Sequence, residues 1–191
     1  ASSTPKEYRQ GVDRVLAYIR AGDCYQANLS QQFEGEFEGS PWQAWQALVE
    51  AIPVPHGGYL DAGPWQLLSV SPELFLEIDN HRVTSKPIKG TRPRSDDAKT
   101  DQALAQDLLA NTKDRAENLM IVDLIRNDLS HFCRPFSVKV PRLFEVESYR
   151  NVHQLVSTVT GTLKQYITPF EAMLSAFPGG SIAGAPKRRA M

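Results

Sequence analysis

The chain has 191 residues, enough for one well-packed domain or a large part of a bigger one, but not for two full domains. Its 41% hydrophobic and 23% charged residues describe an ordinary globular protein and exclude disordered and fibrous classes. Lys and Arg number 21 and Asp and Glu 22, so no overall basic charge attracts nucleic acid or an anionic membrane, and any anion site must be local.

The N-terminal part of the chain predicts a helix. Thr4 is a suitable N-cap, Pro5 is pre-set for the first helical position, and Glu7 completes a capping box with Thr4. Apolar residues then recur at helical spacing: Val12, Val15, Leu16 and Ile19. Gly22 is typical of a helix end. We therefore expect a helix from Pro5 to about Gly22.

The next segments predict a strand, a helix and more strands. Residues 24–37 alternate in polarity, which indicates a strand with a bulge or break near Gly35. The pair "SP" opens a predicted helix over about 41–51. Residues 57–90 carry strand-like segments that are separated by the turn signals "AGP" and "DNH".

The second half of the chain predicts helices and strands in separate blocks. An acidic helix is expected over 97–111 and a stronger one over 113–130. Strand-like stretches follow at 136–140 and 144–162, and a short helix at 168–177 leads into "PGGSIAGAPK". Since no repeat or linker interrupts the chain, these elements predict one α+β unit, mostly antiparallel sheet with flanking helices.

Glu73 and Lys89 are the first candidates for chemistry. In an antiparallel hairpin with its turn centred on His81, Glu73 would face Lys89. The same register would set Leu74 against Ile88 and Ile78 against Thr84. A two-residue turn would shift this register by one residue, so the pairing is a hypothesis.

A carboxylic acid and an amine on one wall of a pocket can take part in catalysis when their protonation states are unusual. A solvated lysine has a pKa of about 10.4 and cannot attack at neutral pH, but burial or a nearby cation can free the amine. A buried, protonated glutamate can donate its proton to a leaving group. The alternative for Glu73 and Lys89 is a cross-strand ion pair on a solvated face, which is a common arrangement.

Glu117 is a candidate metal ligand. By helical spacing it shares a face with Ile121, Leu124 and Asp128. A carboxylate among apolar neighbours needs a cation, and Mg²⁺ typically takes one or two protein carboxylates. The alternative is an exposed glutamate in the first turn, stabilised by the helix dipole.

The glycine-rich segment "PGGSIAGAPK", which includes Gly180, is a candidate anion site. Backbone N–H groups ahead of a helix can cradle an anion. It is not a Walker A loop, because Ala185 and Pro186 stand where that motif needs Lys and Ser or Thr. A plain turn between helices is the alternative.

Other classes of site are excluded or left open. His153 alternates with Leu155 and Ser157 in a predicted strand, where a lone histidine is more often a packing residue than a catalyst. No GxSxG is present, and Cys24 and Cys133 form neither a CxxC nor a zinc-type spacing. Without an apolar run long enough for a membrane or a signal-peptide core, the cytoplasm is the expected location.

Six blocks of sequence carry a family resemblance. They are "GDCYQANLS", "SPELFL", "KPIKGTRPR", "DRAENLMIVDLIRND", "VHQLVS" and "FPGGSIAGAPKRRAM". In order and spacing they resemble the chorismate-utilising enzymes, which include anthranilate, aminodeoxychorismate, isochorismate and salicylate synthases. The resemblance implies that residues 1–191 are part of a chorismate-binding catalytic domain, without an N-terminal region and a C-terminal part. We therefore expect this piece alone to be inactive.

Two positions distinguish branches of the family. In the pattern of isochorismate and salicylate synthases, a lysine stands at the position that resembles Gln26 of this chain. The amide of Gln26 cannot act as a base. Anthranilate synthases have alanine where this chain has Lys89, whereas "PIKGT" is similar to component I of aminodeoxychorismate synthase, the large subunit of para-aminobenzoate synthase. The alternatives are anthranilate synthase component I, with Lys89 a bystander, and a binding fragment without catalysis.

The resemblance also implies roles and partners. Lys89 would attack C2 of chorismate as the C4 hydroxyl leaves, Glu73 would act as general acid and then base, and Glu117 would bind Mg²⁺. The residues that it implies for substrate binding are Gly90, Thr91, His153 and Gly180. Ammonia from a glutamine amidotransferase subunit would then add at C4, on the route to folate. A second metal-binding glutamate would lie after Met191, and a tryptophan site at "PVPHGGYL" stays open.

Overall fold

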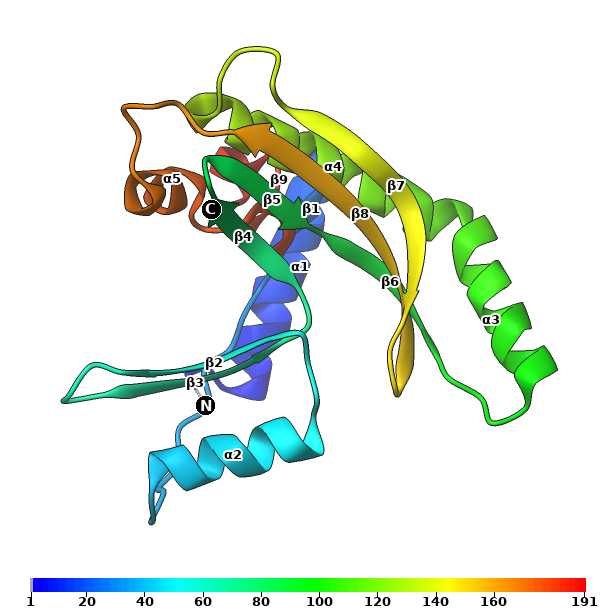
Figure 1. Cartoon of the computed structure of the whole chain (residues 1–191). Coiled ribbons are helices and arrows are strands. Elements are labelled where there is room, and N and C mark those ends of the chain that lie inside the picture. Colours follow the sequence, from blue (N-terminus) through cyan, green and yellow to red (C-terminus); the bar gives the residue numbers. More distant parts are fainter. Residues whose placement is uncertain (1) are drawn as a thin grey trace.

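The protein is described from a computed structural model that covers residues 2–191 (Figure 1). The helices are α1 (Pro5–Ala21), α2 (Pro41–Ala51), α3 (Ala98–Ala110), α4 (Thr112–Phe132), α5 (Pro169–Ala176), α6 (Gly180–Ala183) and α7 (Lys187–Ala190). The strands are β1 (Gln26–Ala27), β2 (His56–Asp61), β3 (Gln66–Ser71), β4 (Leu74–Asp79), β5 (Arg82–Lys86), β6 (Ile88–Pro93), β7 (Lys139–Ser148), β8 (Val152–Thr162) and β9 (Gly184–Ala185).

The main sheet is built around β8. Along one edge, β8 pairs first with β6 and then with β5, and β4 continues the sheet beyond β5. Along its other edge, β8 pairs with β7. All of these pairs are antiparallel. Pro87, which has no backbone N–H, separates β5 from β6, while its carbonyl accepts from the Ser157 N–H at 3.1 Å. The segments β5 and β6 therefore form one interrupted edge along β8.

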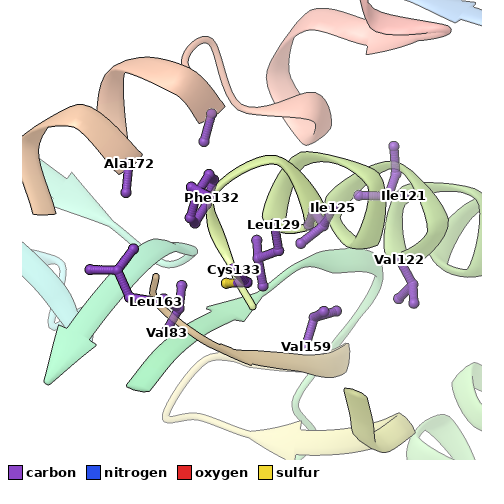
Figure 2. Packing of buried hydrophobic residues seen from close by; sticks show 11 residues of the cluster. Val83, Ile121, Val122, Ile125, Leu129, Phe132, Cys133, Val159, Leu163 and Ala172 are labelled. Carbon is purple, nitrogen blue, oxygen red and sulfur yellow. The ribbon is translucent and has the colours of Figure 1, made fainter. Parts of the chain in front are cut away.

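Helix α4 covers one face of this sheet and supplies more of the core than any other element. Its buried apolar side chains recur at helical spacing: Ile121, Val122, Ile125, Leu129 and Phe132. Figure 2 shows Ile125 and Leu129 on the side of α4 that faces Val83 of β5 and Val159 of β8. The same cluster includes Cys133, Leu163, Ala172 and Ala176. Since each fully buried side chain of this size contributes about 1.5–3 kcal/mol, this packing fixes α4 against the sheet.

A separate hairpin carries an aromatic cluster. Strands β2 and β3 pair with each other, and α2 packs beside them, away from the main sheet in Figure 1. Trp42 and Trp45 of α2 meet Tyr59 of β2, with ring centroids 5.1 Å and 6.1 Å from the tyrosine ring. Offset and edge contacts of this kind are favourable for aromatic pairs.

The predicted α+β class is confirmed, and so are most elements. The first helix has the expected capping box at Thr4 and a left-handed Gly22 at its end. The helices expected over 41–51, 97–111, 113–130 and 168–177 are present with slightly different ends. Among residues 2–191, no helix combines the length and apolar character that crossing a membrane would require.

Two strand predictions are wrong. Of residues 24–37, only Gln26–Ala27 form a strand, because only the short β9 pairs with it, and Phe33 and Phe37 are exposed. The stretch 144–162 is not one strand, since a turn at 149–151 divides it between β7 and β8. Alternation of polarity indicates a strand only where a partner strand is available.

The predicted hairpin register is also wrong. Asn80 and His81 have φ values of 46° and 64°, which is the pattern of a two-residue turn with both central residues left-handed. Ile78 therefore lies opposite Val83 rather than Thr84. A further register shift between Leu74 and Glu77 sets Leu74 opposite Lys86 rather than Ile88. Lys89 lies on β6, which pairs with β8, so the hairpin does not set it against Glu73.

Candidate functional site

Glu73 and Lys89 nevertheless come close together, at α6. The ammonium Nζ of Lys89 donates to the backbone carbonyl of Ser181 at 3.4 Å. Burial raises the pKa of the Glu73 carboxyl, while the Ser181 side chain, the positive charge of Lys89 and the backbone N–H of Ile88 act in the opposite direction. The two predicted catalytic groups therefore share one environment, which α6 completes.

A bulge in β6 aims Lys89. Ile88 pairs with Val156 and Thr91 with Gln154, so the register shifts by one residue at Lys89 and Gly90. Gly90 has φ +92°, and a Cβ there would lie 2.8 Å from Cγ of Asp114. Only glycine suits both the left-handed backbone and the close approach of α4.

The turn before β4 holds Glu73. Ser71 Oγ donates to the Glu73 carbonyl at 3.0 Å and accepts from the Glu73 N–H at 3.3 Å. This local loop of hydrogen bonds is a frequent serine turn. It fixes the backbone of Glu73 where β3 passes into β4, so the side chain is held at the start of a rigid strand.

A cavity of about 300 Å³ lies beside Glu73. Its wall is mostly apolar, and residues that line it include Glu73, Phe75, Asp128, Phe177, Gly180 and Ser181. Burial likewise raises the pKa of Asp128, and Lys187 opposes this. Glu73 and Gly180 are the predicted site residues on this wall, while Lys89 approaches Ser181 from β6. The mostly apolar cavity therefore favours the protonated form of the carboxyl groups that line it.

The glycine loop, defined as residues 177–181, forms one side of the cavity. A Cβ at Gly180 would lie 2.5 Å from Cδ2 of Leu124, and one at Gly179 would lie 3.2 Å from Cδ2 of Phe75. The loop backbone thus packs directly on α4 and β4. This close packing explains the two glycines without any bound anion, and the predicted anion cradle stays a prediction.

His153 is buried between β8 and α3. Its Nδ1 is 2.8 Å from Ser148 Oγ and its Nε2 is 2.9 Å from Asp101 Oδ1. The Arg94 guanidinium donates two hydrogen bonds to the same Asp101 carboxylate, at 2.8 Å and 2.9 Å. Since a carboxylate only accepts, Nε2 donates, which fixes the ring. Both ring nitrogens are engaged within the chain, and His153 lies outside the cavity beside Glu73.

Glu117 lies on α4 with its side chain partly exposed, 3.9 Å from Nζ of Lys113. Within residues 2–191, no group of three His, Cys, Asp or Glu side chains is arranged to hold a metal ion. Mg²⁺ usually binds one or two carboxylates together with water and substrate oxygens. Glu117 is therefore a half-exposed carboxylate beside Lys113, and its role as a Mg²⁺ ligand stays a prediction.

The sequence interpretation missed Lys187 and Asp128. Lys187 Nζ donates to Asp128 Oδ2 at 2.8 Å, and both side chains are almost entirely buried. Asp128 was noted only as a neighbour on the Glu117 face of α4. The signal that could have found the pair is a lysine directly after the glycine-rich segment, because a buried lysine needs a buried acceptor.

This chain is similar to one known protein family and to several named synthases. The family described as chorismate binding enzyme matches residues 1–191. Aminodeoxychorismate synthase component 1 of Salmonella typhimurium is 47% identical over 191 residues, covering 100% of this chain and 42% of that protein. Anthranilate synthase component 1 of Thermus thermophilus is 42% identical over 191 residues, covering 100% of this chain and 41% of that protein.

A solved structure is similar as well. Anthranilate synthase component I from Streptococcus pneumoniae superimposes with a TM-score of 0.85 and 36% identity, covering 98% of this chain and 41% of that one. The chain therefore spans about two fifths of the length of these relatives.

Proposed function

The chain belongs to the chorismate-binding enzyme family, and from this premise we propose that it is part of an enzyme that aminates chorismate at C4, giving 4-amino-4-deoxychorismate. The observation that carries the proposal is the meeting of Lys89 with Glu73 and Ser181 at the β6 bulge. An amine beside a buried carboxyl group is the arrangement that a reaction through a covalent amine adduct requires. The relatives named aminodeoxychorismate synthase component 1 support the same choice.

Lys89 is the proposed nucleophile. Its neutral amine forms a bond to C2 of chorismate, the two conjugated ring double bonds each shift by one bond toward C4, and the C4–O bond breaks. Glu73 gives its proton to the departing hydroxyl, which leaves as water. The raised pKa of Glu73 supports this role, since burial keeps a larger share of the carboxyl protonated.

Ammonia completes the exchange. It forms a bond to C4, the two ring double bonds each shift back by one bond, and the C2–N bond to Lys89 breaks, which returns Lys89 as a neutral amine. Glu73, now a carboxylate, takes a proton from the added ammonia. The net reaction consumes chorismate and ammonia and releases water, and one hard displacement is divided into two easier ones.

The remaining groups would bind and supply the reactants. Mg²⁺ would neutralise the ring carboxylate of chorismate, with Glu117 as one ligand. Gly90, Thr91 and Gly180 are the proposed substrate-binding residues. His153, whose ring nitrogens bond to Ser148 and Asp101, would support them from β8, where it lies opposite Arg92 of β6. A component 1 implies a second component, which we propose is a cytoplasmic glutamine amidotransferase that delivers ammonia.

The test uses the full-length protein with chorismate, Mg²⁺ and ammonium. We expect 4-amino-4-deoxychorismate and, by mass spectrometry, a chorismate-derived adduct on the Lys89 peptide that is absent from Lys89→Ala. Anthranilate as the product would instead favour anthranilate synthase, to which this chain is also similar. No product at all would favour a binding role. We expect the isolated 191-residue chain to show no turnover, and turnover by it would contradict that part of the proposal.

A further inference from the structure

We propose that Lys187 and Asp128 are positioning residues for the reaction, holding the glycine loop so that Ser181 meets Lys89. The inference rests on the proposed function in so far as Lys89 is the nucleophile. It assigns a task to a buried ion pair that touches none of the proposed reacting atoms.

Lys187 ties three segments together. Its ammonium group has three N–H donors, and three acceptors surround it. They are Asp128 Oδ2 on α4 at 2.8 Å, the Ala176 carbonyl at the end of α5 at 2.8 Å, and the Pro178 carbonyl in the glycine loop at 3.1 Å. The side chains of Lys187 and Asp128 are only 14% and 8% exposed, so water competes little for their hydrogen bonds.

The glycine loop depends on this anchor for its position. Gly179 and Gly180 have no side chains that could lock into the core, so the backbone itself lies on Phe75 and Leu124. The Pro178 carbonyl is therefore a main polar attachment of the loop. Ser181, three residues further on, presents the carbonyl that accepts from Lys89. A displaced Pro178 would carry Ser181 away from Lys89.

The energetics separate positioning from stability. Removing one partner of a buried ion pair leaves an unpaired charge and costs several kcal/mol, but replacing both partners by apolar residues is often neutral or stabilising. Substituting the whole pair can therefore restore stability without restoring the three hydrogen bonds of Lys187. Stability and loop position become independent observables.

The experiment compares Lys187→Met with the double variant Lys187→Met/Asp128→Leu in the full-length protein. Without chorismate, trace acetic anhydride labels the lysines, and mass spectrometry gives the ratio of Lys89 to Lys86 labelling. Lys86 is the internal reference because its ammonium group pairs with Glu147 of β7. Tm and kcat are measured on the same samples.

We expect Lys187→Met to lower Tm, to raise the labelling ratio several-fold as Lys89 loses its carbonyl acceptor, and to lower kcat by about ten- to a hundredfold. The double variant should recover Tm but neither the labelling ratio nor kcat. An unchanged labelling ratio in both variants, or a kcat that returns together with Tm, would overturn the inference.

A matched control is Lys164→Met, which removes a lysine that donates to one exposed carbonyl, that of His131. It should leave the labelling ratio and kcat unchanged, and an equal effect there would also count against the proposal. The labelling needs no chorismate. Absence of the Lys89 adduct in the unmodified enzyme would therefore contradict the proposed function alone, while the labelling ratio still tests the positioning pair.

Discussion

At the scale of single residues, Glu73 combines a cost in stability with a proposed role in catalysis. Its pKa is raised chiefly by burial, so the charged form is less favourable in the folded protein than in the unfolded chain. The stability that protonated Glu73 contributes is present at low pH and is lost as pH rises through the folded-state pKa. A neutral side chain of the same shape should relieve this cost.

We therefore expect Glu73→Gln in the full-length protein to keep or raise Tm at pH 7 while kcat falls by about 10²–10⁴-fold, because the proton donor is lost. Thermal melts and steady-state kinetics on one preparation give both values. A fall in kcat no greater than threefold, about 0.65 kcal/mol, would show that Glu73 is not the general acid.

The pKa of Asp101 is shifted in the opposite direction from that of Glu73. The Arg94 guanidinium, the Ser95 N–H and His153 all bind its carboxylate and hold its pKa well below the usual range. The stability that it contributes is present above the unfolded-state pKa of about 3.9 and is lost as pH falls below it. Asp101→Asn should therefore lower Tm at pH 7, and its difference from the unmodified protein should shrink between about pH 4 and pH 2.

Melts at several pH values check this expectation. Asp123→Asn is the control, because that carboxylate makes an exposed pair with Arg126 and should change Tm little at any pH. A Tm difference for Asp101→Asn that is the same at pH 7 and pH 2 would mean that the aspartate acts by shape and not by charge.

At the scale of elements, the β6 bulge shows how one glycine decides the direction of a strand. Alanine at Gly90 would hold a left-handed backbone, which costs about 1–3 kcal/mol before any contact with Asp114 is counted. Gly90→Ala should therefore lower the free energy of unfolding by at least that amount. Gly58→Ala is the matched control, since Gly58 lies in a strand with open space around its Cα. Urea denaturation compares the two, and equal effects would remove the argument.

The same elements show what sequence patterns can predict. Helix ends were found from local chemistry, such as the Thr4 capping box and Gly22, because these signals act within one turn. The β4–β5 turn was placed correctly but its register was not, since "DNH" allowed a turn centred on His81 as well as the two-residue turn at Asn80 and His81. Pairing of β6 with β8 joins segments far apart in the chain, which no local pattern specifies.

The candidate site was predictable only in part. The residues were chosen from sequence, and Glu73 and Lys89 do lie together, but for a different reason than the one expected. The contact depends on Ser181, whose position follows from packing of the glycine loop on α4. Lys187 and Asp128 were missed because an ion pair formed by one residue on α4 and one on α7 has no spacing rule.

At the scale of the whole molecule, the core around α4 holds the sheet and the α5 segment together. Leu129 is buried in this core with Phe132 and Val159. Leu129→Ala should reduce the free energy of unfolding by about 2–5 kcal/mol, because it removes apolar contacts and leaves a cavity. Leu119→Ala, on the exposed side of the same helix, should cost less than about 1 kcal/mol. Denaturation curves distinguish the two, and similar costs would contradict the described packing.

The contact between Lys89 and Ser181 joins residues 92 positions apart. Closing so large a loop carries an entropic cost that local helices and hairpins do not, so contacts of this kind tend to form after the nearby ones. The pairing of β6 with β8 also joins distant segments, so the site depends on several long-range contacts at once. The surroundings of Lys89 are therefore complete only when the glycine loop has closed on α4 and β4, which couples the site to the most distant contact that it uses.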